Sequence, residues 1–519
     1  MAQASKSIRQ TKKTGGKRSG KMPSRLEPWE GRLPAGCEAA GEWLIGAVEG
    51  PRRGTRSVSG STRGIGVWEA ASGKLIVGVE ARMLRRAASL VLCAGLLSAC
   101  HLIFGYESPH AAETGPGEMR IRSDLDLTAD APGPCAGLCP LGCKTDGASP
   151  RCYRLLPTNG ATVVNAGFDK ATGDLLINNN LPVTLNTDTG EIKVGSTVLR
   201  QENVLGFHDP SKTYWAPLGQ GPGYPDLSVL VVNKLSIAPN ETVQVVGQAA
   251  LVLYAKSEVF IQGTITSTPN TSAGGFPGAG GFPGSPRLAS TNMNKTCFGG
   301  QGQPGVERWE AGGGGGGRKG DGGQGGKGFS LSSSGGTGGH ISSQTTTPLF
   351  GGCGGGDAGT GGGGGGAIQI SSSHSIVVAP SGIISMPGGG GGPMGGGGGS
   401  GGVIILEAPR VTIENILAAN GGGGAAGGVG ASSKSSGMDG TSWIDSAAGG
   451  VSAEGVNGGS GGAQSAEKGG AGVAASSKEQ QGGGGGGGVG WIYLNAQNLP
   501  TVTGTTSPHW VLGSPLATW

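Results

Sequence analysis

The apolar residues in the second half of the chain fall into short groups that recur. Within each group they alternate with polar residues at period two, and corners of Asn-Ala, Ala-Pro, Ser-Ser or Gly separate the runs. Three clear copies occupy 251–255, 259–261 and 263–265; 368–370, 376–378 and 382–384; and 404–408, 411–413 and 416–418. A degenerate fourth copy occupies 491–494, Leu499 and 502–504. Alternation over such short runs predicts β-strands, arranged as a repeated unit that begins near Val229.

Short strands, tight corners and a repeated unit are the requirements of a β-solenoid, in which each coil stacks its inward apolar residues on the next. The copies are unequally spaced because glycine-rich segments of variable length separate them. We therefore predict an all-β fold, with β-solenoid-like repeats and long glycine-rich loop insertions over 229–519. This region resembles the glycine-rich repeat proteins of bacterial envelopes and the β-helix adhesins of bacterial surfaces. The resemblance is one of pattern without a diagnostic motif, so it bears on fold more than on function.

Turn signals alternate with short apolar runs over 154–228, which predicts a small β-domain before the repeats. Residues 184–194 read as a hairpin that turns at Asp188-Thr189-Gly190. The same three residues match the motif around an aspartic-protease carboxylate. That chemistry needs two carboxylates sharing a proton, and the chain has no second copy of the motif. Asp and Gly also suit a turn, which is the interpretation we adopt.

Glycine accounts for 113 of the 519 residues, without the Gly-X-Y period of collagen. Glycine has no side chain to bury, so the core must come from the apolar strands between the tracts. Two interpretations of the tracts remain open. They are flexible linkers, or they pack as extended polyproline-II-like strands whose backbones approach closely because side chains are absent.

The segment from Met83 has the three parts of a secretory signal peptide. Arg85 and Arg86 are followed by an apolar stretch over 87–97, too short to span a bilayer. Its end, Leu97-Ser98-Ala99-Cys100, resembles the lipobox of bacterial lipoproteins. The resemblance implies cleavage before Cys100, a lipid on its thiol and, because His101 is not an acidic residue, passage to the outer membrane. The alternative is a short buried helix. A buried helix would need neither the preceding arginines nor the small residues before the cysteine.

Residues 1–82 hold 15 of the 38 basic residues and 7 of the 34 acidic ones, and lack a periodic apolar stretch. This composition predicts disorder, and we expect the gene start to lie at Met83, so that this region is not part of the true protein. The alternative is a basic nucleic-acid-binding arm. Without the 17 basic residues before Cys100, the remainder carries 21 basic and 27 acidic residues, a net charge of −6. We therefore expect no nucleic-acid partner.

Six cysteines remain after Cys100, an even number in a chain predicted to enter an oxidising compartment. Four of them are predicted to form a Cys-rich knot over 135–153, which follows a tether over 100–134. They are Cys135, Cys139, Cys143 and Cys152. Their spacing lacks the paired Cys-x2-Cys of common zinc sites and no histidine is near, so we favour disulfides over metal. Cys297 and Cys353 are candidates to pair with each other.

No motif predicts a cofactor, a metal or a catalytic site. No Gly-Lys-Ser/Thr follows a glycine loop, which excludes a P-loop, and the histidines are dispersed. The enzyme alternative is a parallel β-helix that binds or cleaves polysaccharide with acidic residues and one basic residue on neighbouring coils. Glu407, Arg410 and Glu414 lie close in sequence, but we interpret them as a solvated strand face.

The sequence thus predicts a lipid-anchored envelope protein, held in the outer membrane and facing the periplasm or exterior. We expect a structural or adhesive role without catalysis. The expected partners are the membrane and an extracellular polysaccharide or surface protein.

Overall fold

A computed structural model describes residues 139–145, 150–206, 211–269, 275–285, 297, 311–329, 333–341, 344–356, 358–429 and 435–518. It also describes the backbone of two short strands, β1 (Val67–Glu69) and β2 (Leu75–Val77), which form an antiparallel pair. The chain divides into two units, Met1–Arg120 and Ile121–Trp519. The rest of the predicted disordered region over 1–82, and all of the signal peptide and tether, lie outside the described residues.

Strands dominate the second unit, and α2 (Ala161–Phe168) is the one helix among its described residues. Before the repeats come β3 (Cys143–Lys144), β4 (Arg151–Cys152), β5 (Leu155–Leu156), β6 (Leu175–Ile177), β7 (Val183–Asn186), β8 (Ile192–Val194), β9 (Thr197–Arg200) and β10 (Tyr214–Leu218). The chain is mostly β, as the alternating apolar pattern predicted.

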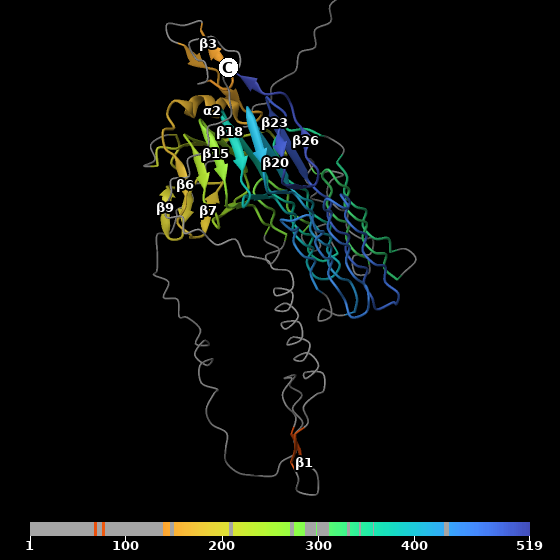
Figure 1. Cartoon of the computed structure of the whole chain (residues 1–519). Coiled ribbons are helices and arrows are strands. Elements are labelled where there is room, and N and C mark those ends of the chain that lie inside the picture. The colour runs from red at the N-terminus through yellow and green to blue at the C-terminus, as the bar shows by residue number, and fades with distance from the viewer. Residues whose placement is uncertain are drawn as a thin grey trace, which may run out of the picture. The chain divides into compact units, whose positions relative to one another are not determined.

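Five successive turns of the chain each contribute one strand to each of three parallel sheets. The first sheet takes β11 (Leu227–Val232), β14 (Ala250–Ala255), β17 (Ala367–Ser372), β20 (Val403–Ala408) and β23 (Trp491–Ala496). The second takes β12 (Leu235–Ile237), β15 (Glu258–Ile261), β18 (Ser375–Val378), β21 (Arg410–Ile413) and β24 (Thr501–Val502). The third takes β13 (Thr242–Val246), β16 (Thr264–Thr266), β19 (Ile383–Ser385), β22 (Ile416–Ala418) and β25 (Thr505–Ser507). Figure 1 shows these strands side by side, coloured from yellow-green to blue along the stack.

The core between the three sheets is built from ladders of aliphatic residues, one from each turn. Leu253 lies opposite Ile370 in the strand register, followed by Leu406 and Leu494. All four are buried in one continuous cluster with residues of the other two sheets. Because the register is parallel and in step, every turn places its apolar residue directly on that of the previous turn. This stacking is what the period-two pattern of the repeats encodes.

Antiparallel strands close one end of the stack. β10 pairs with β11 at the edge of the first sheet, while β8 and β9 extend the third sheet beyond β7. At the other end β26 (Val511–Leu512) pairs in parallel with β23, and β27 (Ala517–Thr518) pairs with β5. The last strand of the chain therefore lies beside the segment that enters the fold, as Figure 1 shows near the label C.

The structure differs from the sequence prediction over 154–228. We expected a separate small β-domain there, but β6 pairs in parallel with β12 and β7 with β13. These two strands thus begin the second and third sheets. The predicted hairpin is present, because β7 and β8 pair on either side of Asp188–Gly190 and Gly190 adopts a positive φ of 70°.

The first sheet differs from the others because both of its faces are buried. Every residue of β11, β14, β17 and β20 is buried, whereas β15, β18 and β21 alternate between buried and partly exposed residues. Its outer face forms a second apolar cluster with Leu155, Val164 of α2 and Leu349. The segment before the repeats therefore covers the first sheet.

The glycine-rich segments are all inserted at one corner of the stack, between a strand of the third sheet and the next strand of the first. They occupy the intervals 267–366, 386–402 and 419–490. In Figure 1 they appear as a set of long extended segments beside the sheets, in green, teal and blue. We call this set the glycine bundle.

Candidate functional site

The tracts of the glycine bundle are hydrogen-bonded to one another with a period of three residues. In the tract 421–427, the amide groups of Gly421, Gly424 and Gly427 donate to one neighbouring tract at 456–462. The intervening amides donate to two further tracts, at 396–399 and 435–438. The donor–acceptor distances run from 2.8 to 3.0 Å. Three residues per turn without internal hydrogen bonds is the geometry of a polyproline-II helix, and not of a β-strand with its period of two.

Close backbone approach explains why these segments contain so little besides glycine. A Cβ atom added at Gly424 would lie 2.2 Å from the carbonyl oxygen of Gly484, and one at Gly421 would lie 2.1 Å from that of Gly487. Contacts under 3.0 Å do not occur for real Cβ atoms. Of the two interpretations that the sequence left open, the described tracts therefore correspond to packed polyproline-II-like strands. Ala425 and Ala426 are also fully buried, so the packing admits a methyl group at chosen positions.

Charged side chains link neighbouring tracts at the end of the bundle nearest the sheets. Asp321 accepts hydrogen bonds from Lys468, at 2.6 Å, and from His340. The Lys468 hydrogen bond is the largest influence on the Asp321 carboxyl and lowers its pKa, with a smaller contribution from His340 and an opposing one from partial burial. Lys319 pairs with Glu467 at 2.6 Å. These pairs add side-chain links between three tracts that are also joined by backbone hydrogen bonds.

The opposite end of the bundle exposes apolar side chains. Tracts that leave the third sheet reverse there and return to the first, so this end lies farthest along the bundle from the sheets. Four large apolar residues are exposed at or near these reversals: Phe329, Val429, Val451 and Val473. We call these four residues the far-end patch. Val451 is 65% exposed although Ser435 hydrogen-bonds to its backbone on both sides. An ordered backbone thus presents a side chain with no intramolecular packing role.

The buried face of the first sheet contains one carboxylate, Glu407, with hydrogen bonds to both oxygens. Thr158 donates from its amide and its hydroxyl, Gln369 donates at 3.0 Å, Ser371 at 2.8 Å and Asn495 at 2.9 Å. These donors come from β17, β23 and the segment before α2. Glu407 is therefore the polar attachment point between the covering segment and the sheet.

The prediction that Glu407, Arg410 and Glu414 form one solvated strand face is wrong for Glu407, which is only 1% exposed. It lies on the covered sheet, while Arg410 begins the next strand and Glu414 is exposed beyond it. Other charged residues of the turns are paired or enclosed. Lys234 binds Glu258, and Glu241 is buried against the amide of Asn180. Within the described residues, no group of three or more metal-ligating side chains occurs.

Arg318 is buried at the junction between the bundle and the first sheet. Its guanidinium carbon lies 3.8 Å from the ring centre of Phe350, and its Nη2 lies 3.5 Å from the carbonyl oxygen of Phe350. Burial lowers the pKa of Arg318 to about 10, which leaves the group charged at neutral pH. Desolvation also raises the pKa of the neighbouring Tyr493 to about 12.

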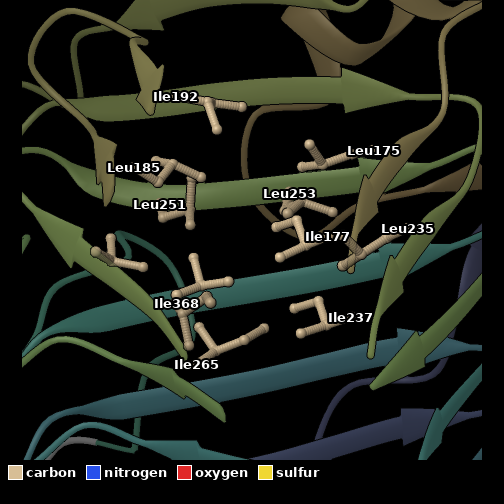
Figure 2. A pocket seen from close by; sticks show the side chains of 12 residues that line it. Leu175, Ile177, Leu185, Ile192, Leu235, Ile237, Leu251, Leu253, Ile265 and Ile368 are labelled. Carbon is tan, nitrogen blue, oxygen red and sulfur yellow. The ribbon is translucent and has the colours of Figure 1, made fainter. Parts of the chain in front are cut away.

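A small packing gap lies in the interior of the stack. Its volume is about 10 Å³, and aliphatic side chains line it, among them Leu175, Leu235 and Ile368. Figure 2 shows these side chains pointing toward one another from opposite strands. A space of this size without polar groups stays dry, so it is part of the core and not a ligand site.

Two disulfides join candidate cysteines that the structure describes at both ends. Cys139 is bonded to Cys152, and Cys297 to Cys353 across 56 residues of the bundle. Cys143 is also disulfide-bonded, and Cys135 lies outside the described residues. No metal is needed to explain this cluster.

The lipobox residues Leu97, Ser98, Ala99 and Cys100 all lie outside the described residues. In the part of the chain that the structure describes, no helix has the length and apolar character needed to cross a bilayer. Neither a family model, nor a curated protein, nor a solved structure matches this chain.

Proposed function

We propose that this protein is a lipid-anchored surface protein that acts as a rigid adhesive spacer without catalytic activity. The three-sheet stack would form a β-solenoid body, and the glycine bundle would carry the contact surface at its far end. The observation that carries the proposal is the far-end patch, where four large apolar side chains are exposed. Isolated apolar residues are ordinary on a surface, but several at one end of a rigid element favour a contact site.

The arrangement of the entering chain supports anchoring from the amino-terminal side. Residues 155–159 are attached to the first sheet by Tyr254, which donates to the Leu155 carbonyl at 3.0 Å, and by the Thr158 bonds to Glu407. β27 adds a backbone pairing to β5. A pull on a tether before this segment would be distributed over a covered sheet instead of a single strand edge.

The anchor is tested by the intact mass and the amino-terminal peptides of the protein isolated from its native membrane. We expect a mature chain that begins at an acylated Cys100, and a Cys100→Ala variant that stays unprocessed or becomes soluble. Peptides from residues 1–82 in the mature protein would overturn both the anchor and the proposed start at Met83.

The contact surface is tested by attachment of cells that carry the Phe329→Asp, Val451→Asp variant. We expect attachment to a polysaccharide-coated surface to fall several-fold. The matched control is Leu499→Asp, which adds a charge at a residue that is 77% exposed on the sheet stack. Equal attachment by both variants, at equal surface display, would exclude the far-end patch as the contact.

A further inference from the structure

Arg318 is a fully buried cation without an anionic partner among the residues that the structure describes. Its side chain is 1% exposed, and its Nε and Nη1 atoms have no hydrogen-bond acceptor. Among the described residues, the groups that act electrostatically on it are the phenols of Tyr493 and Tyr224, and no carboxylate is among them. Removing a charge from water without compensation is among the most costly arrangements in a protein. Stacking on Phe350 offsets part of that cost.

Two more buried polar groups lack a hydrogen-bond partner in the described part of the chain, on Tyr493, which interacts electrostatically with Arg318, and on Trp491, which stacks on Tyr493. They are the Nε1 atom of Trp491 and the hydroxyl of Tyr493, whose rings stack at 5.5 Å. The guanidinium and the indole can only donate hydrogen bonds, and the phenol can donate one. Three groups that can all donate a hydrogen bond, one of them positively charged, are complementary to an anion.

We propose that Arg318, Trp491 and Tyr493 form a binding site for a small free anion, such as chloride or an inorganic oxyanion. A carboxylate or phosphate on a larger partner does not suit the site, because each of the orphaned atoms is shielded from solvent. The proposal is independent of the function proposed above.

The position of the site explains what the anion would do. Arg318 lies where one tract of the bundle reverses beside the first sheet, and Lys319 next to it donates its amide to Val489 just before β23. Trp491 and Tyr493 belong to β23 itself. The anion would therefore bridge the bundle and the sheet.

Entry would take place beside Tyr224. Its ring lies 5.6 Å from that of Phe350, it is 37% exposed, and it belongs to a loop with positive-φ glycines at 221 and 223. Gln220 ties this loop to Leu349 through two hydrogen bonds of 2.6 and 2.7 Å. Tyr224 is thus a partly exposed residue in contact with the ring on which Arg318 stacks.

The test is thermal unfolding of the full protein while potassium gluconate is replaced by potassium chloride, or separately by potassium phosphate, at constant ionic strength. Gluconate, a large organic anion, serves as the reference. We expect the unfolding temperature to rise and saturate with the anion that binds, because a ligand specific to the folded state stabilises it. Arg318→Gln should abolish the rise, and Lys327→Gln, which removes an exposed cation from the same tract, should preserve it.

A second variant keeps the test decisive if Arg318→Gln does not fold. Tyr493→Phe removes one orphaned donor, so we expect the half-saturating anion concentration to rise at least about threefold while stability in gluconate is unchanged or greater. Two results would each overturn the proposal: an equal anion response in wild type and Arg318→Gln, or an unchanged half-saturating concentration in Tyr493→Phe.

Discussion

Single polar residues determine how the parts of this protein are held together. Glu407 joins the entering segment to the first sheet, and Asp321 joins three tracts of the bundle. Both are carboxylates on elements that are otherwise apolar or glycine-rich. Sequence reasoning placed Glu407 on a solvated face because alternation along β20 says which residues share a face, but not whether another segment covers that face.

Replacing Glu407 with Gln should destabilise the protein by about 1–3 kcal/mol. The amide nitrogen of Gln cannot accept the hydrogen bonds that one carboxylate oxygen now receives, so at least one buried donor loses its acceptor. The measurement is the midpoint of urea unfolding. Glu414→Gln, at an exposed position, should leave the midpoint unchanged, and an equal loss in both variants would contradict this account.

Asp321 predicts a dependence of stability on acid pH. The pKa of Asp321 is lowered in the folded state. Its contribution to the free energy of unfolding is therefore present above the unfolded pKa of about 3.9, and is lost as the pH falls through the pKa of the folded state. Asp321→Asn should therefore lower stability at pH 7 by less than about 1 kcal/mol, since the group is partly exposed. At pH 2 the variant and wild type should unfold at the same urea concentration. If the two proteins still differ in stability at pH 2, the effect comes from packing and not from the charge of Asp321.

At the scale of elements, two backbone geometries are combined in one chain. The turns of the stack use β-strands with a period of two, and the bundle uses extended tracts with a period of three. In both geometries the backbone N–H and C=O groups are hydrogen-bonded to neighbouring segments and not within the same element. The bundle does so without side chains, which is why its inner positions tolerate no Cβ at Gly421 or Gly424.

Gly424→Ala should lower the free energy of unfolding by about 1–3 kcal/mol, because the new methyl group meets a backbone carbonyl that can move only with its whole tract. Gly219→Ala is the matched control, since its nearest neighbour would be a carboxylate oxygen at 3.6 Å and its φ is not in the left-handed region. Thermal unfolding of the two variants measures the difference. Similar stabilities would mean that the bundle is looser than its backbone contacts indicate.

At the scale of the molecule, all long insertions leave the stack at one corner and assemble with one another. Three insertions that are far apart in sequence thus contribute to one bundle, which sits beside the covered first sheet. The disulfide between Cys297 and Cys353 links two parts of the longest insertion. It closes a loop of 56 residues, which in the chain-entropy model corresponds to about 4 kcal/mol.

Replacing Cys297 and Cys353 with Ser should lower the unfolding temperature, since the unfolded chain gains the entropy of the open loop. The matched variant, Cys139→Ser with Cys152→Ser, removes a disulfide that closes a loop of only 13 residues, so its unfolding temperature should fall less. Non-reducing calorimetry of both variants gives the comparison. A larger loss in the second variant would show that the Cys297–Cys353 bond does not restrict the unfolded state as the loop length implies.

The sequence by itself determined which residues form strands and which ones face the core, because alternation and corners are local properties of the chain. Three of the four turns that it identified match the strands closely, as at 251–265, although it assigned 154–228 to a separate domain. Only the tertiary structure decided that β6 and β7 begin the sheets, that the face bearing Glu407 is covered, and that the glycine tracts are ordered. Each of these depends on contacts between segments tens to hundreds of residues apart, which no local pattern of apolar and polar positions can specify.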